Sequence, residues 1–175
     1  MPKNVEIKAR LNDAKSARNI ARRLSGGDPE VIDQHDVFFA SRSGRIKLRM
    51  FPDGTGDLIE YHRPDAAEIR TSSYRLAKTQ DAGALRDILT NMGATVVGEV
   101  RKRRLLYLVG QTRVHIDRVE KLGDFLEFEV VLRADQQESE GSVITSALMN
   151  AFGVEPAQLV GSAYLDLLTC TDDHS

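Results

Sequence analysis

Carboxylate and basic side chains recur along this chain with the types and spacing expected of a metal and phosphate site. The acidic set is Glu6, Asp117, Glu127 and Glu129, and the basic set is Lys8, Arg45, Lys47, Arg49, Arg63, Lys102 and Arg104. Carboxylate oxygens suit Mg²⁺ or Mn²⁺, hard ions that act together with substrate phosphates. Guanidinium and ammonium groups bind phosphate oxygens, and several together suit a polyphosphate. The two sets therefore predict metal-assisted phosphoryl chemistry.

These charged residues alternate with apolar ones in segments typical of β-strands. Arg45, Lys47 and Arg49 alternate with aliphatic residues, and so do Glu127 and Glu129. Because successive side chains of a strand point to opposite faces, each segment has an apolar face and an ionic face. The ionic faces either enclose a site or form the solvated side of an ordinary half-exposed sheet. Alternation alone favours the solvated side, since exposed charged strands are common.

The elements that must position these residues predict an α+β fold in which strands outnumber helices. The predicted strands are Asn4–Leu11, Val31–Ala40, Gly44–Phe51, Asp57–Arg63, Thr71–Lys78, Thr95–Val109, Thr112–Val119 and Asp124–Leu132. The predicted helices follow Asp13 and Asp81 as caps and cover Ser139–Phe152 and Ser162–Leu168. Many antiparallel strands favour a closed or nearly closed barrel, because closure removes exposed edges. We expect a single domain over residues 1–170, with 171–175 as a frayed tail.

Composition limits the classes of partner and location. The chain has 175 residues, 41% of them hydrophobic, and a net charge of −2, so it has no global basic field for nucleic acid or a membrane surface. Cys170 is the only cysteine, which excludes an intrachain disulfide and a cysteine-rich zinc site. No N-terminal apolar stretch resembles a signal peptide, and no apolar run is long enough to span a bilayer, so we expect neither. We expect a cytoplasmic protein that binds neither nucleic acid nor membrane.

Several segments, taken in order, resemble the CYTH family, whose members are also called triphosphate tunnel metalloenzymes. Asn4–Lys8 resembles the family's E-x-E-x-K signature. The other matching segments are Asp36–Phe39, Gly44–Arg49, Tyr61–Pro64, Val100–Arg104, His115–Val119, Leu122–Glu129 and Ser162–Leu168. The family includes class IV adenylyl cyclases, thiamine triphosphatases and inorganic tripolyphosphatases. The resemblance favours the enclosed arrangement of the ionic faces.

The resemblance implies a closed antiparallel eight-stranded β-barrel, a tunnel with a charged interior and helices packed outside. It implies that Glu6, Glu127 and Glu129 hold Mg²⁺ or Mn²⁺, with Asp117 as a direct or water-mediated partner. The residues expected to bind a triphosphate are Lys8, Arg45, Lys47, Arg49, His62, Arg63, Lys102 and Arg104. Glu6, Lys8 and Glu129 are expected to act in catalysis. A homodimer is an expectation at the level of the family.

Two positions depart from the family pattern. Asn4 occupies the first Glu position of the signature, which removes one carboxylate and predicts weaker metal binding or a single metal site. His62 lies where many members carry a lysine, and a histidine there would be a pH-dependent phosphate contact. Arg63 takes that role instead if the register differs by one residue.

The resemblance leaves several functions open. The predicted function is that of a class IV adenylyl cyclase, which converts ATP to cyclic AMP and pyrophosphate. This preference depends on Gly44–Arg49, His115–Glu129 and the C-terminal segment. One alternative is a triphosphatase acting on tripolyphosphate, thiamine triphosphate or a nucleoside triphosphate. Another is a non-catalytic nucleotide- or polyphosphate-binding module.

Overall fold

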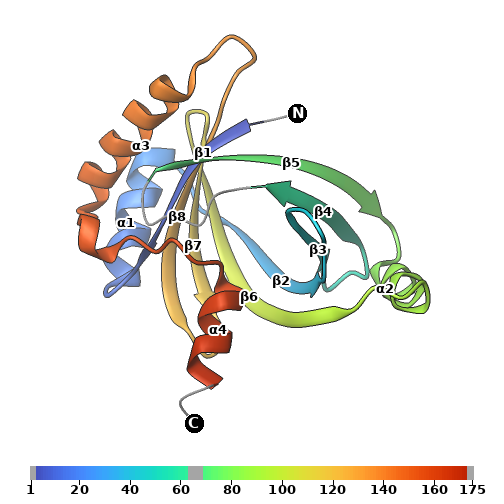
Figure 1. The fold of residues 1–175 in the computed structure, drawn as a ribbon. Helices are drawn as coiled ribbons and strands as arrows, with labels where there is room; N and C mark the ends of the chain where they lie inside the picture. The colour runs from blue at the N-terminus through green and yellow to red at the C-terminus, as the bar shows by residue number, and fades with distance from the viewer. Residues whose placement is uncertain (1–2, 63–68, 173–175) are drawn as a thin grey trace.

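Eight antiparallel strands close into a ring around a central cavity (Figure 1). The computed structural model describes residues 3–62 and 69–172 of the chain. The strands are β1 (Lys3–Arg10), β2 (Glu30–Phe39), β3 (Arg45–Met50), β4 (Gly56–His62), β5 (Arg70–Thr79), β6 (Val96–Val109), β7 (Thr112–Val119) and β8 (Gly123–Val131). Their order around the ring is β1-β5-β4-β3-β2-β6-β7-β8, and β8 pairs again with β1. The predicted α+β fold with a closed antiparallel sheet is confirmed.

Helices cover the apolar outer faces of the strands. On one side, α1 (Ala14–Ser25) and α3 (Glu138–Phe152) pack over β1, β7 and β8, where Ile7 and Phe128 are fully buried (Figure 1). On the other side, α2 (Ala82–Asn91) packs with Leu85 and Leu89 against Leu48 of β3. Because the helices take up the apolar faces, the ionic faces of the same strands are left toward the cavity.

Local sequence sets where the first two helices begin. The Asp13 side chain accepts a hydrogen bond of 2.9 Å from the backbone N–H of Ser16, and Asp81 accepts one of 2.8 Å from Ala84. These contacts satisfy N–H groups that have no partner within the helix. The first helix ends at Gly26, whose φ of 75° is a left-handed conformation that suits glycine. Both caps agree with the sequence prediction.

The C-terminal helix brings a distant segment to the cavity. A short 3₁₀ turn, Pro156–Gln158, leads to α4 (Tyr164–Asp172). Tyr164 is buried with Phe38, Val100 and Phe125, and its ring lies 4.9 Å from that of Phe125, centroid to centroid. The helix thus extends into the region predicted as a frayed tail, of which 173–175 lie outside the described residues. Within the described parts of the chain, no helix has the length and apolarity to cross a bilayer.

Candidate active site

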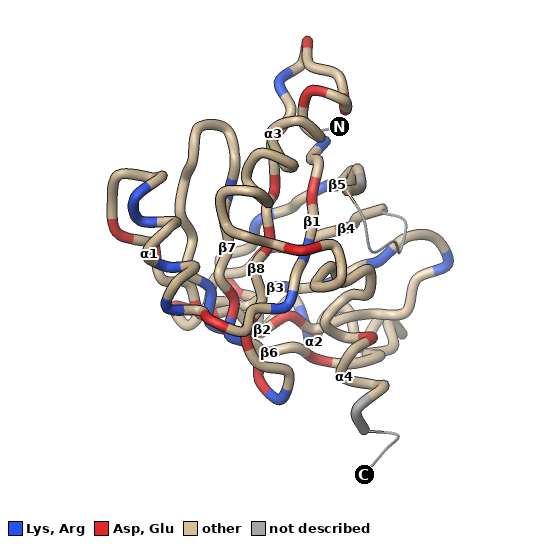
Figure 2. Tube along the Cα trace, turned by 90° about the vertical axis from the view of Figure 1, so that its left-hand side faces the viewer, with Lys and Arg blue, Asp and Glu red and all other residues tan. Residues whose placement is uncertain are grey.

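The ring encloses a cavity of about 750 Å³ that receives side chains from all eight strands and from the start of α4. Charged positions of both signs lie on the strands around it, as on β1 (Figure 2). The predicted site residues that line it are Glu6, Lys8, Lys47, Arg49, Lys102, Arg104, Glu127 and Glu129. The alternation of charge along the strands therefore reflects an enclosed face, and the half-exposed sheet is excluded.

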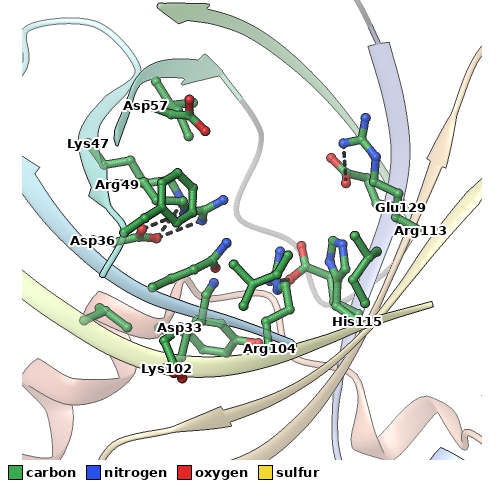
Figure 3. Close-up of a pocket in the computed structure, with 18 of the residues that line it drawn as sticks. Asp33, Asp36, Lys47, Arg49, Asp57, Lys102, Arg104, Arg113, His115 and Glu129 are labelled. Atoms are coloured by element: carbon green, nitrogen blue, oxygen red, sulfur yellow. Dashed lines mark hydrogen bonds and ion pairs between the residues drawn. The ribbon is translucent and has the colours of Figure 1, made fainter. Parts of the chain in front are cut away.

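A first basic cluster forms around Asp36 on β2 (Figure 3). Arg49 donates to both carboxylate oxygens of Asp36, at 2.8 and 2.9 Å, and the Lys47 ammonium donates at 3.0 Å. Burial would raise the pKa of Asp36, but the charges of Arg49 and Lys47 outweigh it and hold the pKa well below its usual range. Burial, with repulsion from Arg49, lowers the pKa of Lys47 to about 8. One carboxylate thus orients two phosphate-binding side chains.

A second basic cluster forms around Asp117 on β7. Arg104 donates to both of its oxygens at 2.7 Å, and the Tyr164 hydroxyl donates at 3.0 Å. The Lys102 ammonium lies 3.7 Å from the same carboxylate. Burial, with repulsion from Arg104, lowers the pKa of Lys102 to about 7. Burial would raise the pKa of Asp117, but Arg104 and Lys102 outweigh it and keep this carboxyl ionised. Asp117 is completely buried, and both of its oxygens are engaged by Arg104, so its predicted metal role stays a prediction.

The ring of Tyr164 joins the second cluster to β1. The Lys8 ammonium lies 4.0 Å from the ring centroid and that of Lys102 lies 5.0 Å from it. Lys8 also donates a hydrogen bond of 3.1 Å to the carbonyl oxygen of Ser162. Both ammonium groups are attracted to the ring's π electrons, and this attraction strengthens when water is excluded. Tyr164 therefore helps to place two cations at the cavity surface.

The acidic residues of the site gather on β1 and β8. The register pairs Glu6 with Glu129, and Lys8 with Glu127. Glu127 accepts a hydrogen bond of 3.2 Å from Arg104, and Glu129 accepts one of 3.1 Å from Arg113 of β7 (Figure 3). Burial raises the pKa of Glu129. The charge of Arg113 acts against this rise, whereas repulsion from the neighbouring carboxylates of Glu127 and Glu6 adds to it. This wall of the cavity therefore concentrates negative charge.

The oxygen atoms on this wall fit a divalent cation. Among the described residues, no three carboxylate, imidazole or thiol groups already form a metal-binding cluster. The Asn4 amide nitrogen donates to Glu129, while its Oδ1 is buried and accepts no hydrogen bond from any described residue. A buried acceptor without a partner is costly, and a hard cation would satisfy it. Such an ion would also relieve the repulsion among the carboxylates of Glu6, Glu127 and Glu129.

Three other predicted residues lie away from the cavity wall or outside the described residues. Arg45 is at the start of β3 and donates at 2.9 Å to Asp166 of α4. His62 is exposed at the end of β4, with its Nε2 3.8 Å from a carboxylate oxygen of Glu60. Arg63 falls outside the described residues. The predicted phosphate contacts of these residues stay predictions.

Sequence reasoning assigned no role to four residues that shape the site. Asp36, Arg113 and His115 line the cavity, and Tyr164 reaches it from α4. Strand parity could have placed Arg113 and His115 on the same face as Asp117, because the three are two residues apart on β7. Burial, followed by repulsion from Arg104, lowers the pKa of His115 well below its usual range, which leaves this imidazole neutral.

The chain is similar in sequence to one protein family and in fold to several proteins of known structure. The family model of the CYTH domain matches residues 2–164. A Methanocaldococcus jannaschii protein named "putative adenylate cyclase" is 23% identical over 169 residues, which cover 93% of this chain and 97% of that protein. A Pyrococcus horikoshii protein of known structure has a TM-score of 0.79 and 24% identity, covering 94% of this chain and 98% of its own. An RNA triphosphatase from S. pombe has a TM-score of 0.51 and 11% identity, covering 86% and 77%. The two structural matches show a shared fold.

Proposed function

Because the chain belongs to the CYTH family, we propose that it is a divalent-metal-dependent enzyme of the adenylyl cyclase type, which converts ATP to cyclic AMP and pyrophosphate. The observation that carries the proposal is the division of charge within the cavity. The clusters around Asp36 and Asp117 each hold two bases per carboxylate, whereas β1 and β8 carry Glu6, Glu127 and Glu129. A triphosphate with its metal ion carries the complementary charges.

The clusters supply positioning and charge neutralisation, which provide most of the catalysis in phosphoryl transfer. Arg49 and Arg104 are each held by two hydrogen bonds, so their orientation is fixed before a ligand arrives. Lys47 and Lys102 add ammonium groups beside them. A bound Mg²⁺ or Mn²⁺ would neutralise phosphate charge and make an attacking hydroxyl more acidic.

In the proposed cyclase reaction the ribose 3′-oxygen forms a bond to the α-phosphorus of ATP. The bond from that phosphorus to the oxygen bridging to the β-phosphate breaks, and pyrophosphate leaves. Glu129 is a candidate acceptor for the hydroxyl proton, because burial raises the pKa of its carboxyl toward the range that suits a general base.

A triphosphatase is the second candidate, favoured by the fold shared with an RNA triphosphatase. In that reaction water attacks the terminal phosphorus, and the bond from that phosphorus to the bridging oxygen breaks. The remaining diphosphate part of the substrate leaves, and the terminal phosphoryl group is released as orthophosphate. The same basic clusters would bind the substrate, since both reactions stabilise charge on phosphoryl oxygens.

Product analysis distinguishes the candidates. The protein is incubated with ATP, tripolyphosphate or thiamine triphosphate and with Mg²⁺ or Mn²⁺. Cyclic AMP with pyrophosphate supports the cyclase, and orthophosphate supports the triphosphatase. Tight binding without turnover under either metal would contradict both and indicate a binding module.

Two matched variants test the acidic wall. Glu127→Gln keeps the shape of the side chain but removes its charge, and we expect it to abolish metal-dependent turnover while leaving the melting temperature close to that of the wild type. Glu120→Gln makes the same change at an exposed position in the turn before β8 and should retain turnover. Full activity in Glu127→Gln would contradict the assignment of the metal site.

A further inference from the structure

One part of the cavity wall differs in chemistry from the rest. Ile59 and Tyr61 of β4 and Tyr74 and Leu76 of β5 line the cavity with uncharged side chains, and we name these four residues the neutral wall. On the same face of β4, Asp57 also lines the cavity, next to this wall and opposite Arg49 in the β3–β4 register (Figure 3). Each of the six strands other than β4 and β5 likewise contributes at least one charged side chain to the lining. Neither the basic clusters nor the acidic residues of β1 and β8 include any of the four residues of the neutral wall.

The strand register makes the neutral wall continuous. Tyr61 pairs with Tyr74, and Ile59 pairs with Leu76, so two adjacent cross-strand pairs share one face. Ile59 and Tyr61 are buried, whereas Leu76 is 44% exposed. The wall thus runs from a buried, partly aromatic end to an apolar end in contact with solvent.

The neutral wall adjoins the first basic cluster. On the β3–β4 pair Lys47 lies opposite Ile59, and its ammonium is 5.5 Å from the centroid of the Tyr61 ring. The ring order places β4 and β5 across the cavity from β6 and β7, which carry Lys102 and Arg104 and the Arg113–Asp117 row (Figure 1). If Lys47 and Arg49 bind the phosphates of a ligand, a group attached to those phosphates can therefore lie along the neutral wall.

We propose that the neutral wall is the subsite for a planar aromatic group, such as a nucleobase, carried by an organic triphosphate. This inference rests on the proposed function, because the basic clusters must first bind the phosphates. Aromatic and aliphatic side chains beside a cation cluster suit a ligand that is apolar and flat at one end and polyanionic at the other. Inorganic tripolyphosphate has no such group and would leave the neutral wall in water.

Binding measurements on two ligands test the subsite. Titration calorimetry with Ca²⁺ in place of Mg²⁺ gives dissociation constants for ATP and for tripolyphosphate. Tyr74→Ser removes a stacking surface, and we expect the dissociation constant for ATP to rise about tenfold, within the range known for loss of one base–aromatic contact. The dissociation constant for tripolyphosphate should change by less than about twofold, since that ligand does not touch the wall.

A second variant and a control protect the test from effects on folding. Leu76→Ser changes a side chain that is already partly exposed. It should raise the dissociation constant for ATP by a smaller factor than Tyr74→Ser does and leave that for tripolyphosphate unchanged. Leu108→Ser removes the same group from an exposed position on β6, outside the cavity lining, and should leave both affinities unchanged.

The possible results separate the subsite from the proposed function. If both wall variants bound ATP and tripolyphosphate more weakly by the same factor, the proposed subsite would be contradicted, because this result indicates general damage to the tunnel. Unchanged ATP binding in both variants would also overturn it, while leaving triphosphate binding in place. If the wild type bound neither ligand, the proposed function itself would be contradicted and the subsite with it.

Discussion

Binding of a triphosphate should draw protons from solvent onto the two buried lysines of the basic clusters. The pKa of Lys102 lies at about 7 and that of Lys47 at about 8, because burial and the neighbouring arginines disfavour a second positive charge. A polyanion beside them reverses this balance and raises both pKa values toward the usual lysine range. The lysines that are neutral before binding then become protonated.

The pKa values set the size of the effect. At about pH 8, Lys102 is about 90% neutral and Lys47 about half neutral, so binding should take up somewhat more than one proton. At about pH 6 both are already protonated, and uptake by these groups should fall to about a tenth of a proton. Since protons are bound with the ligand, affinity falls as pH rises, by about tenfold between pH 7 and pH 8 for these two groups.

Calorimetry with tripolyphosphate and Ca²⁺, in two buffers of different ionisation enthalpy, measures the uptake directly. Lys102→Arg keeps the positive charge on a group that does not titrate in this range, and it should reduce uptake by about 0.9 proton at about pH 8. Lys15→Arg makes the same change on an exposed residue of α1 and should leave the uptake unchanged. Equal heats in the two buffers, or the same uptake in Lys102→Arg as in the wild type, would refute the reasoning.

Three further predictions concern the groups that hold the site together. Arg113→Gln removes the cation that donates to Glu129 at 3.1 Å. Mn²⁺ should then bind several-fold more tightly, as measured by electron paramagnetic resonance. An unchanged affinity would mean that Arg113 does not compete with the metal. Asp117→Asn removes the charge of the carboxylate that binds Arg104 through two hydrogen bonds and leaves this buried guanidinium with Glu127, at 3.2 Å, as its remaining counter-ion; it should lower the free energy of unfolding in urea by about 3 kcal/mol. An unchanged midpoint would show that another group replaces Asp117. Tyr164→Phe removes only the hydroxyl that donates a hydrogen bond to Asp117, and it should lower the free energy of unfolding by about 2 kcal/mol in the same assay. A loss as large as that of Asp117→Asn would contradict this expectation.

Strand parity predicted which residues face the cavity, since the two-residue period of a strand fixes the face of each side chain. Together with the family resemblance, parity predicts that Lys47, Arg49 and Glu127 lie on the enclosed face, and all three line the cavity. Parity does not fix depth along a strand. Arg45 has the same parity as Lys47 but lies at the start of β3, where it contacts Asp166 instead of the cavity.

The partners of the charged residues could not be predicted, because they depend on how distant strands come together. Asp36 meets Arg49 only because β2 and β3 pair in one register, which places these two residues directly opposite each other. Tyr164 is 47 positions from Asp117 and reaches it only after α4 packs against the ring. A single sequence reports the local period of a strand but contains no direct measure of such long-range contacts.

The distribution of charge gives the tunnel a direction. Asp36 and Asp117 each neutralise one of two neighbouring bases, so each cluster keeps one positive charge in excess when all groups are ionised. Arginine does not release its proton near neutral pH, so the repulsion within each cluster instead lowers the pKa of its lysine.

The wall of β1 and β8 has the opposite excess. Repulsion from Glu6 and Glu127 adds to burial in raising the pKa of Glu129. A metal–triphosphate complex, whose cation and phosphates are displaced from each other, relieves both excesses only when its metal faces β1 and β8 and its phosphates face the clusters around Asp36 and Asp117. The reversed orientation would place like charges together in a cavity that screens them poorly, so charge alone should select one direction of binding.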